Sequence, residues 1–451
     1  MKLALSLAAA AVLAACGGND PRPGDQTPKV KFSSQVSFGD SLSDVGTYAV
    51  GTVKALGGGT FNINGNNTAV NPALTGKNWT DLVAAQLGLP APCAALTGLD
   101  GDASKGFSVP QQVHTGCYGY AQGGSRVTNP IGVGNKATGS ALGALTFPAV
   151  TQVKNHLAAV GGKFKGDEIV FIWSGNNDIL FGLEDLGAKA TAAGTTAGGT
   201  AFAMSLASQL AAGTSNPAAA AQAIALAIAT ENARPGHTDQ TIVGAAVTAA
   251  VAAGNTSAAS PAVYGPMVAK AQADATAAGT KAGNDYLAAH GPELVNDLAK
   301  AGAEMAALVK NQILANGANY VAVINLPDLA FTPAAQARDA STRALITAAS
   351  KAFNAQLATL ASESKVLVID AFFISQDEAA HPENYGYTNM KDTACDLAKN
   401  PLGNSLACNA TNLRAGDVSH YGFADTVHPT PFHYQLIAKY VSEQLLIKGW
   451  L

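Results

Sequence analysis

Four short candidate strands, three of which are apolar runs, are separated by helical patterns and limit the fold of this chain more than any other feature. They are bounded by turn residues and cover 35–38, 168–173, 320–324 and 366–369. Short runs of this kind are typical of strands that are buried on both faces. Because strand and helix alternate, we expect a central parallel sheet covered by helices on both sides. Ligands bind at the carboxyl ends of the strands in such sheets.

Helical patterns fill the intervals between these runs. Asn78 is a typical N-cap for an amphipathic run that continues to Leu87. Further helices are expected over 148–160 and 432–447, and the segment 42–56 could continue as a helix after the first strand.

The segment 186–289 differs from the rest because it is rich in alanine and punctuated by glycine and by Asn216-Pro217. We interpret it as an insertion of small-residue helices within one main domain that covers 31–451. It begins shortly after Asn177, which follows a strand, so it must leave the sheet near the edge that binds ligands. A cap over the site is one interpretation, and a solvated excursion is the other.

The charge balance bears on the class of partner. The chain has 27 basic and 31 acidic residues and no basic block. This pattern lacks the electrostatic footprint of a nucleic-acid-binding protein, so we expect no nucleic-acid partner.

The first residues are typical of an export signal. Lys2 precedes an apolar run over 3–15 that is too short for a stable membrane span. Residues 13–16 read Leu-Ala-Ala-Cys, which looks like a bacterial lipobox with Cys16 as the lipid-modified residue. We therefore expect a signal peptide over 1–15, a flexible tether over 16–30 and a lipid anchor in the bacterial cell envelope, at the outer membrane or surface. The alternative is an ordinary signal peptide with a coincidental cysteine.

Export makes the other four cysteines disulfide candidates. Four cysteines allow three connectivities, and the sequence does not choose among them. Two local pairs are the simplest arrangement, and a zinc site is disfavoured because no C-x-x-C pair occurs. The local pairs would join Cys93 to Cys117 and Cys395 to Cys408.

Two polar segments near opposite ends of the chain suggest nucleophilic catalysis. The first reads Phe-Gly-Asp-Ser-Leu-Ser-Asp over 38–44, and the second reads Asp-Thr-Val-His-Pro-Thr over 425–430. A serine hydroxyl needs an imidazole to take its proton, and the imidazole works best when a carboxylate orients it. The spacing places Asp425 beside His428, whereas only the fold can bring Ser41 to them.

Other roles for these residues stay open. The first segment could be a turn that caps a helix, and Asn177 could be a turn residue after a strand. His428 could instead bind a metal with His420 or His433. That alternative is disfavoured because Pro429 and Pro431 stand between His428 and His433, which excludes a regular helical pair of ligands.

Taken together, these segments make the chain similar to the SGNH hydrolases, the GDSL-type esterases and lipases. The family pattern has four short blocks in a set order, and each has a counterpart here: 39–42, 120–125, 175–178, and Asp425 with His428. The segments 325–329 and 353–357 also look like family segments. The match covers most of the chain outside 186–289.

The resemblance implies a flavodoxin-like, three-layer α/β/α fold and a role for each matching residue. Ser41 would be the nucleophile, His428 the general base and then acid, and Asp425 its orienting partner. The oxyanion hole would combine the amides of Ser41 and Gly124 with the side chain of Asn177. Because Gly123 and Gly124 are adjacent, either amide could be the second oxyanion donor, and Gly124 is the expected one. Gly119 stands where the family often has asparagine.

We therefore expect an exported serine ester hydrolase that needs neither cofactor nor metal. Its substrates would be carboxylic esters of short- to medium-chain acyl groups, or lipids. The alternatives are a phospholipase or lipid acyltransferase, a carbohydrate acetyl esterase, and a surface lipoprotein that binds without catalysis. Oligomeric state is not predicted.

Overall fold

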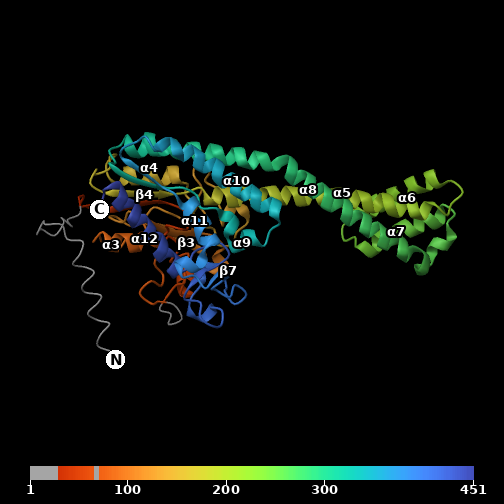
Figure 1. Cartoon of the computed structure of the whole chain (residues 1–451). Coiled ribbons are helices and arrows are strands. Elements are labelled where there is room, and N and C mark those ends of the chain that lie inside the picture. Colours follow the sequence, from red (N-terminus) through yellow and green to blue (C-terminus); the bar gives the residue numbers. More distant parts are fainter. Residues whose placement is uncertain (1–28, 66–70) are drawn as a thin grey trace, which may run out of the picture.

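The computed structural model describes residues 29–65 and 71–451 (Figure 1). The protein is a mixed α/β protein in which the four predicted strands form one parallel sheet, in the order β1-β4-β5-β6. The strands are β1 (Gln35–Gly39), β4 (Ile169–Trp173), β5 (Tyr320–Ile324) and β6 (Val366–Ile369). All four predicted strands are confirmed.

Successive strand side chains point to opposite sides of this sheet, so the strands contribute to two separate hydrophobic cores. On one face, Val170 and Ile172 belong to a core shared with α4 (Ala149–Ala159), α8 (Pro261–Leu308) and α10 (Ala340–Leu357). On the other face, the alternate strand residues pack with α3 and α12. These two helices span Trp79–Gln86 and Pro431–Lys448.

The helix that begins after Asn78 is confirmed, with Asn78 and Asp81 forming a capping box. The suggested helix over 42–56 is largely wrong, because only α2 (Gly51–Ala55) is helical there. The Asp44 carboxylate accepts hydrogen bonds from the amides of Gly46 and Thr47 at 2.9 and 2.7 Å. Such local side-chain bonds compete with helix formation and hold this segment in turns.

The remaining elements are short. Two small sheets flank the central one, an antiparallel pair of β2 (Leu96–Asp100) and β3 (Ser108–Val113) and a parallel pair of β7 (Asn389–Thr393) and β8 (Tyr421–Phe423). Helices α9 (Pro333–Gln336) and α11 (Ala371–Ala380) follow β5 and β6, and a π-helical stretch, Val309–Leu314, follows α8.

Both local disulfides are present. Cys93 is bonded to Cys117, and Cys395 is bonded to Cys408. Of the three connectivities that four cysteines allow, the structure therefore has the simplest one. The second disulfide closes a loop that also contacts the site described below.

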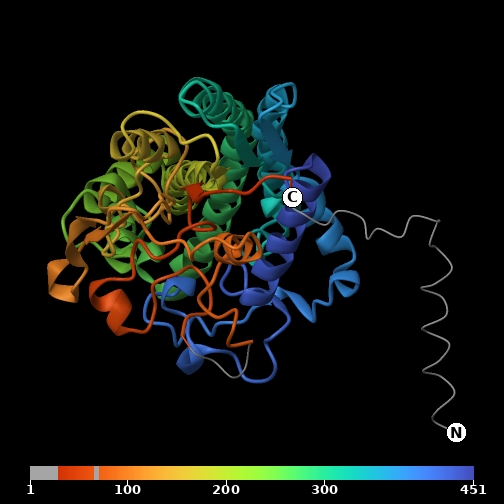
Figure 2. The ribbon, with the colours of Figure 1, turned by 90° about the vertical axis from the view of Figure 1, so that its left-hand side faces the viewer.

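Long helices carry part of the chain away from the sheet. Helix α5 (Asn176–Ala211) begins directly after the loop that follows β4, earlier than the predicted start at 186, and α8 returns to the sheet. Figure 1 shows α6 (Pro217–Asn232) and α7 (Asp239–Ala252) at the far end of these two helices. We call helices α5 to α8 the helical arm. Figure 2 views the molecule along this arm, with the N-terminal and C-terminal segments on the near side.

The far end of the helical arm has a core of its own, with members such as Leu206, Ile224 and Ala246. The suggested cap over 186–289 stays a prediction. Within residues 29–65 and 71–451, no helix combines the length and apolar character that crossing a membrane requires. The expected signal peptide and Cys16 lie outside the described residues, as does the tether up to residue 28.

Candidate active site

The two polar segments from opposite ends of the chain meet at the carboxyl end of the sheet. Ser41 follows β1, and His428 lies in the loop before α12. The Nε2 atom of His428 is 2.9 Å from the Ser41 Oγ atom, although 387 positions separate the two residues. The Nδ1 atom of His428 is 2.7 Å from the Asp425 Oδ2 atom. The arrangement is a continuous chain from hydroxyl to imidazole to carboxylate, as expected for an activated serine.

Backbone amides hold the carboxylate of Asp425 in place. Its Oδ1 atom accepts hydrogen bonds from the amides of Val427 and His428 at 2.9 and 2.8 Å, and its Oδ2 atom accepts one from Ser405 at 2.6 Å. Burial opposes ionisation of this group, which is 2% exposed, but the charge of His428 and these hydrogen bonds lower the pKa of Asp425 below its ordinary value. The carboxylate therefore stays charged and orients the imidazole.

Two contacts of this pair were not predicted from the sequence. Ser405 comes from the loop closed by the Cys395–Cys408 disulfide, so that bridge supports the carboxylate. The ring of Phe61 lies over the imidazole of His428, with ring centroids 4.8 Å apart and planes tilted by 31°. Neither residue belongs to a recognisable motif, so nothing in the sequence identified them.

Asp40, next to the serine, links the first polar segment to the start of α5. Its carboxylate accepts hydrogen bonds from the Leu42 amide at 3.1 Å and from the Asn176 side chain at 3.0 Å. Burial raises the pKa of Asp40 to about 6, and the hydrogen bonds from Asn176 and Leu42 counteract only part of that effect. The Asp40 carboxyl group thus fixes the turn that contains Ser41 against the start of α5.

Two amides are available beside Ser41 for an oxyanion. The Gly123 amide donates to the Asp44 Oδ2 atom at 2.9 Å and is therefore occupied. Within the described part of the chain, the amides of Gly124 and Ser41 donate no hydrogen bond inside the protein. Gly124 has a φ of +82°, and a Cβ atom there would lie 2.0 Å from the Val133 carbonyl oxygen. Only glycine fits this backbone position. Of the two adjacent glycines, Gly124 is therefore the one whose amide is available to an oxyanion.

The third expected donor, Asn177, lies in the first turn of α5 and is buried. Its Nδ2 atom donates to the Ser125 carbonyl oxygen at 2.9 Å, which orients the amide. A side-chain amide has two N–H groups, so one stays available. The loop that carries Ser125 also carries Gly124, so this bond joins two of the expected oxyanion elements.

Gln152 on α4 was also missed at the sequence level. Its Oε1 atom accepts from the Gly39 amide, and its Nε2 atom donates to the Gly39 carbonyl oxygen, both at 2.8 Å. Gly39 has a φ of +143°, and a Cβ atom there would lie 2.0 Å from the Trp173 carbonyl oxygen. The close approach of the two strands and the clamp by Gln152 set the direction in which the chain leaves β1 toward Ser41.

The other histidines named as metal ligands have separate partners. The Nε2 atom of His433 lies 3.3 Å from the Glu378 carboxylate, and its Nδ1 atom lies 3.1 Å from the Gly422 carbonyl oxygen. His420 packs edge-on against Phe432. Over 29–65 and 71–451, no three or more histidine, cysteine, aspartate or glutamate side chains are grouped so that they could hold a metal ion.

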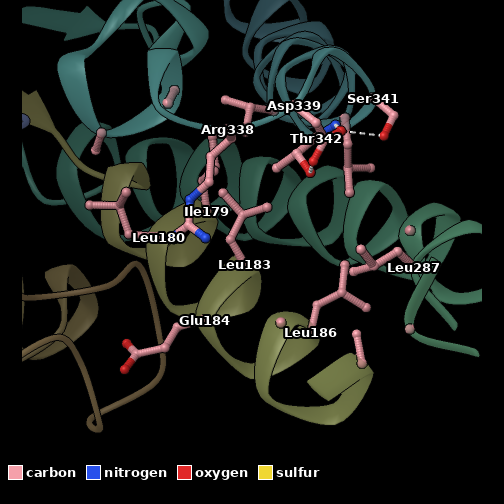
Figure 3. Close-up of a pocket in the computed structure, with 18 of the residues that line it drawn as sticks. Ile179, Leu180, Leu183, Glu184, Leu186, Leu287, Arg338, Asp339, Ser341 and Thr342 are labelled. Atoms are coloured by element: carbon pink, nitrogen blue, oxygen red, sulfur yellow. Dashed lines mark hydrogen bonds between the residues drawn. The ribbon is translucent and has the colours of Figure 1, made fainter. Parts of the chain in front are cut away.

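A cavity of about 1610 Å³ adjoins this site on the side of the helical arm (Figure 3). Thr426 and Val427, the two residues between Asp425 and His428, form part of its wall. Most of the remaining wall comes from α5, α8 and the segment from α9 to the start of α10. The loop that carries Asp425 and His428 therefore also borders a large cavity.

Comparisons with known proteins add no assignment. No protein-family model matches this chain, and no curated protein matches it.

Proposed function

We propose that the protein is a serine hydrolase that cleaves carboxylic esters through a covalent acyl-enzyme. The observation that carries this proposal is the contact of the Ser41 Oγ atom with His428, whose other ring nitrogen contacts Asp425. This chain of three groups contains the nucleophile, the base and the orienting carboxylate that acyl transfer requires.

Each group has a defined role in the proposed reaction. Ser41 attacks the ester carbonyl carbon while its proton passes to the Nε2 atom of His428. The resulting imidazolium, stabilised by Asp425, then protonates the leaving alkoxide, and the acyl group stays on Ser41. A water molecule, deprotonated by His428, attacks the acyl-enzyme and releases the carboxylic acid, which restores the serine.

The oxyanion that forms in both steps would be bound by the amides of Ser41 and Gly124 and by the Asn177 side chain. Support comes from the two unoccupied amides and from the fixed orientation of Asn177. Preorganised neutral donors stabilise developing negative charge without adding a competing charge, and each one typically contributes about 10²- to 10³-fold in turnover.

We also propose that the chain is an SGNH hydrolase of the GDSL type with a flavodoxin-like, three-layer fold and an Ala-rich helical insertion. The motifs at 39–42, 120–125, 175–178 and 425–428 support this, because hydrogen bonds connect them around one site. Helices on both faces of the parallel sheet support the layer arrangement.

Export and lipid anchoring through Cys16 remain part of the proposal. The two disulfides support export, because such bonds persist in oxidising compartments. An anchor at Cys16 would hold the enzyme near lipid substrates in the cell envelope.

The test is covalent labelling with a fluorophosphonate probe, followed by assays with p-nitrophenyl esters, phosphatidylcholine and acetylated xylan. Wild type should be labelled, and Ser41→Ala should lose both labelling and hydrolysis. Ser43→Ala is the matched control, because Ser43 is also buried and its hydroxyl has no hydrogen-bond partner among the described residues.

Labelling of Ser41→Ala to the wild-type level would contradict the proposal, and so would a wild-type protein that hydrolyses no ester in the panel. The panel also separates the alternatives. Preferential release of fatty acid from phosphatidylcholine, or transfer of that acyl group to an added alcohol, would indicate the phospholipase or acyltransferase. Preferential release of acetate from xylan would indicate the carbohydrate esterase.

A further inference from the structure

The cavity beside the site is continuous with the catalytic elements. Thr426 and Val427 come from the loop of the acid and base, and Ile179 closely follows Asn177 on α5. Val133, also in the wall, donates its amide to the Gly124 carbonyl oxygen at 3.1 Å. Three segments that carry or contact the proposed catalytic groups thus contribute to the wall, which places the cavity next to the site.

From there the cavity runs along the helical arm. Leu180 stands near its start on α5, and Gly194 is the last residue of α5 in its wall. At the helical rise of 1.5 Å per residue, this stretch is about 21 Å long. A Cβ atom at Gly194 would lie 2.8 Å from the Gly279 carbonyl oxygen of α8, so the two helices touch there. The close contact marks the far end of a long, narrow groove, which we call the arm groove.

The wall of the arm groove is mainly apolar. Figure 3 shows Ile179, Leu180 and Leu183 side by side on α5, with Leu287 of α8 farther along. Arg338 reaches toward the near part of the groove, whereas Glu184 points away from these leucines. The charged side chains of Arg338 and Asp339 come from the segment between α9 and α10, whereas the aliphatic side chains of α5 and α8 supply a surface that suits a flexible aliphatic chain.

We propose that the arm groove binds the acyl chain of the substrate, so that the enzyme prefers esters of long-chain fatty acids. This inference rests on the proposed ester hydrolysis at Ser41. A cavity of about 1610 Å³ exceeds the roughly 300–1,000 Å³ of ordinary small-molecule sites. An acetyl group would leave almost all of it unused, whereas each buried methylene group of a longer chain should raise kcat/KM by about fourfold.

Two glycines of α5 provide a matched pair of variants. Gly187 belongs to the groove wall, and a Cβ atom added there meets no other atom within 4 Å. Gly187→Phe should therefore fill the groove without distorting the helix. Gly199 lies farther along the same helix, also with open space around an added Cβ atom, and is not part of the wall. Gly199→Phe makes the same substitution away from the groove, and both changes favour the helix.

The readout is the ratio of kcat/KM for p-nitrophenyl palmitate to that for p-nitrophenyl acetate. Gly187→Phe should lower this ratio at least about tenfold, because the palmitoyl chain loses several buried methylene groups. Gly199→Phe should keep the wild-type ratio. If Gly187→Phe keeps the wild-type ratio, acyl-chain binding in the arm groove is contradicted while ester hydrolysis at Ser41 is not. If the wild-type protein cleaves neither ester, the proposed function itself is contradicted.

A binding measurement tests the same inference without turnover. In the Ser41→Ala background, fluorescence titration with dansyl-labelled undecanoic acid should give a Kd at least about tenfold weaker when Gly187→Phe is added. Addition of Gly199→Phe should leave the Kd unchanged. Equal Kd values for the two double variants would contradict chain binding in the arm groove.

Discussion

The α/β part of the molecule and the far end of the helical arm place their polar groups in opposite ways. Around the site, the carboxylates of Asp40, Asp44 and Asp178 are buried and bound by distant parts of the chain. In the arm the interior is aliphatic, and charges lie outside in exposed pairs such as Lys270 with Asp274. The α/β part buries these charges beside the proposed catalytic groups, at a desolvation cost that the arm avoids.

The range of the contacts differs as well. Ser41 contacts His428, 387 positions away, and Asp40 contacts Asn176, 136 positions away. Single hydrogen bonds therefore join distant segments of the chain. In the arm, contacts repeat along helix pairs, so the loss of one contact should have a smaller effect. Single substitutions should therefore act strongly in the α/β part and weakly in the far end of the arm. Four predictions test this contrast.

The largest effect is expected for Asp425→Asn. The amide cannot stabilise the imidazolium and favours the wrong tautomer of His428, so kcat for ester hydrolysis should fall about 10⁴-fold. Steady-state kinetics with p-nitrophenyl butyrate measures the change. Asp417→Asn in the preceding loop is the control, because Asp417 is exposed and bonds only locally to the Ser419 amide. If kcat of Asp425→Asn decreases by less than tenfold, the Asp425 carboxylate has no role in the mechanism.

The next effect is on stability, and its sign should differ between the two regions. The pKa of Asp40 is raised to about 6 by burial, so its ionisation destabilises the folded state as pH rises from about 4 to above 6. Asp40→Asn removes that cost. Its free energy of unfolding, relative to wild type, should increase by at most about 3 kcal/mol between pH 4 and pH 7, as measured by urea denaturation.

Asp274 in the arm should show the opposite sign. Hydrogen bonds from Ser205 and Lys270 lower the pKa of Asp274, so its stabilisation is present at neutral pH and is lost as pH falls through the lowered pKa. Asp274→Asn should therefore be less stable than wild type at pH 7 and approach it in acid. If the free energy of unfolding relative to wild type changes with pH in the same direction in Asp40→Asn and Asp274→Asn, the contrast between the two regions is contradicted.

The smallest effect on catalysis is expected from removing the far end of the arm. Gly198 of α5 and Ala275 of α8 lie side by side, since a Cβ atom at Gly198 would be 3.1 Å from the Ala275 carbonyl oxygen. Replacing 199–274 by a short glycine-serine loop removes the separate core but no part of the arm groove wall. We expect kcat/KM for short- and long-chain esters to stay within about twofold, because contacts of the site are unchanged.

A loss above tenfold in this shortened chain, with the α/β part still folded by circular dichroism, would show that the far end acts on the site. That result would favour the interpretation of 186–289 as a cap.

Several features followed from local sequence alone. The strands were recognisable because runs such as 169–173 are apolar throughout and bounded by turns. The N-cap at Asn78 was recognisable because asparagine directly before an amphipathic run is a typical helix start. The segment after Ser41 was misjudged, because the Asp44 carboxylate turns the backbone at Gly46 and Thr47 where the pattern allowed a helix.

Other features had no local signal. Gln152 clamps Gly39 from another helix, and Phe61 covers His428 from a loop. An isolated glutamine or phenylalanine carries no motif, so its role depends on which distant residue the fold places opposite it. The occupied amide of Gly123, which leaves Gly124 as the available donor, likewise depends on the position of Asp44.

Residue types and short spacings already specified the parallel strands, the pairing of Asp425 with His428 and the chemistry that a serine needs. Folding alone brought Ser41 to that pair and opened a long apolar space beside it. Side chains three positions apart are held together by the backbone, whereas groups 387 positions apart meet only through the packing of every element between them.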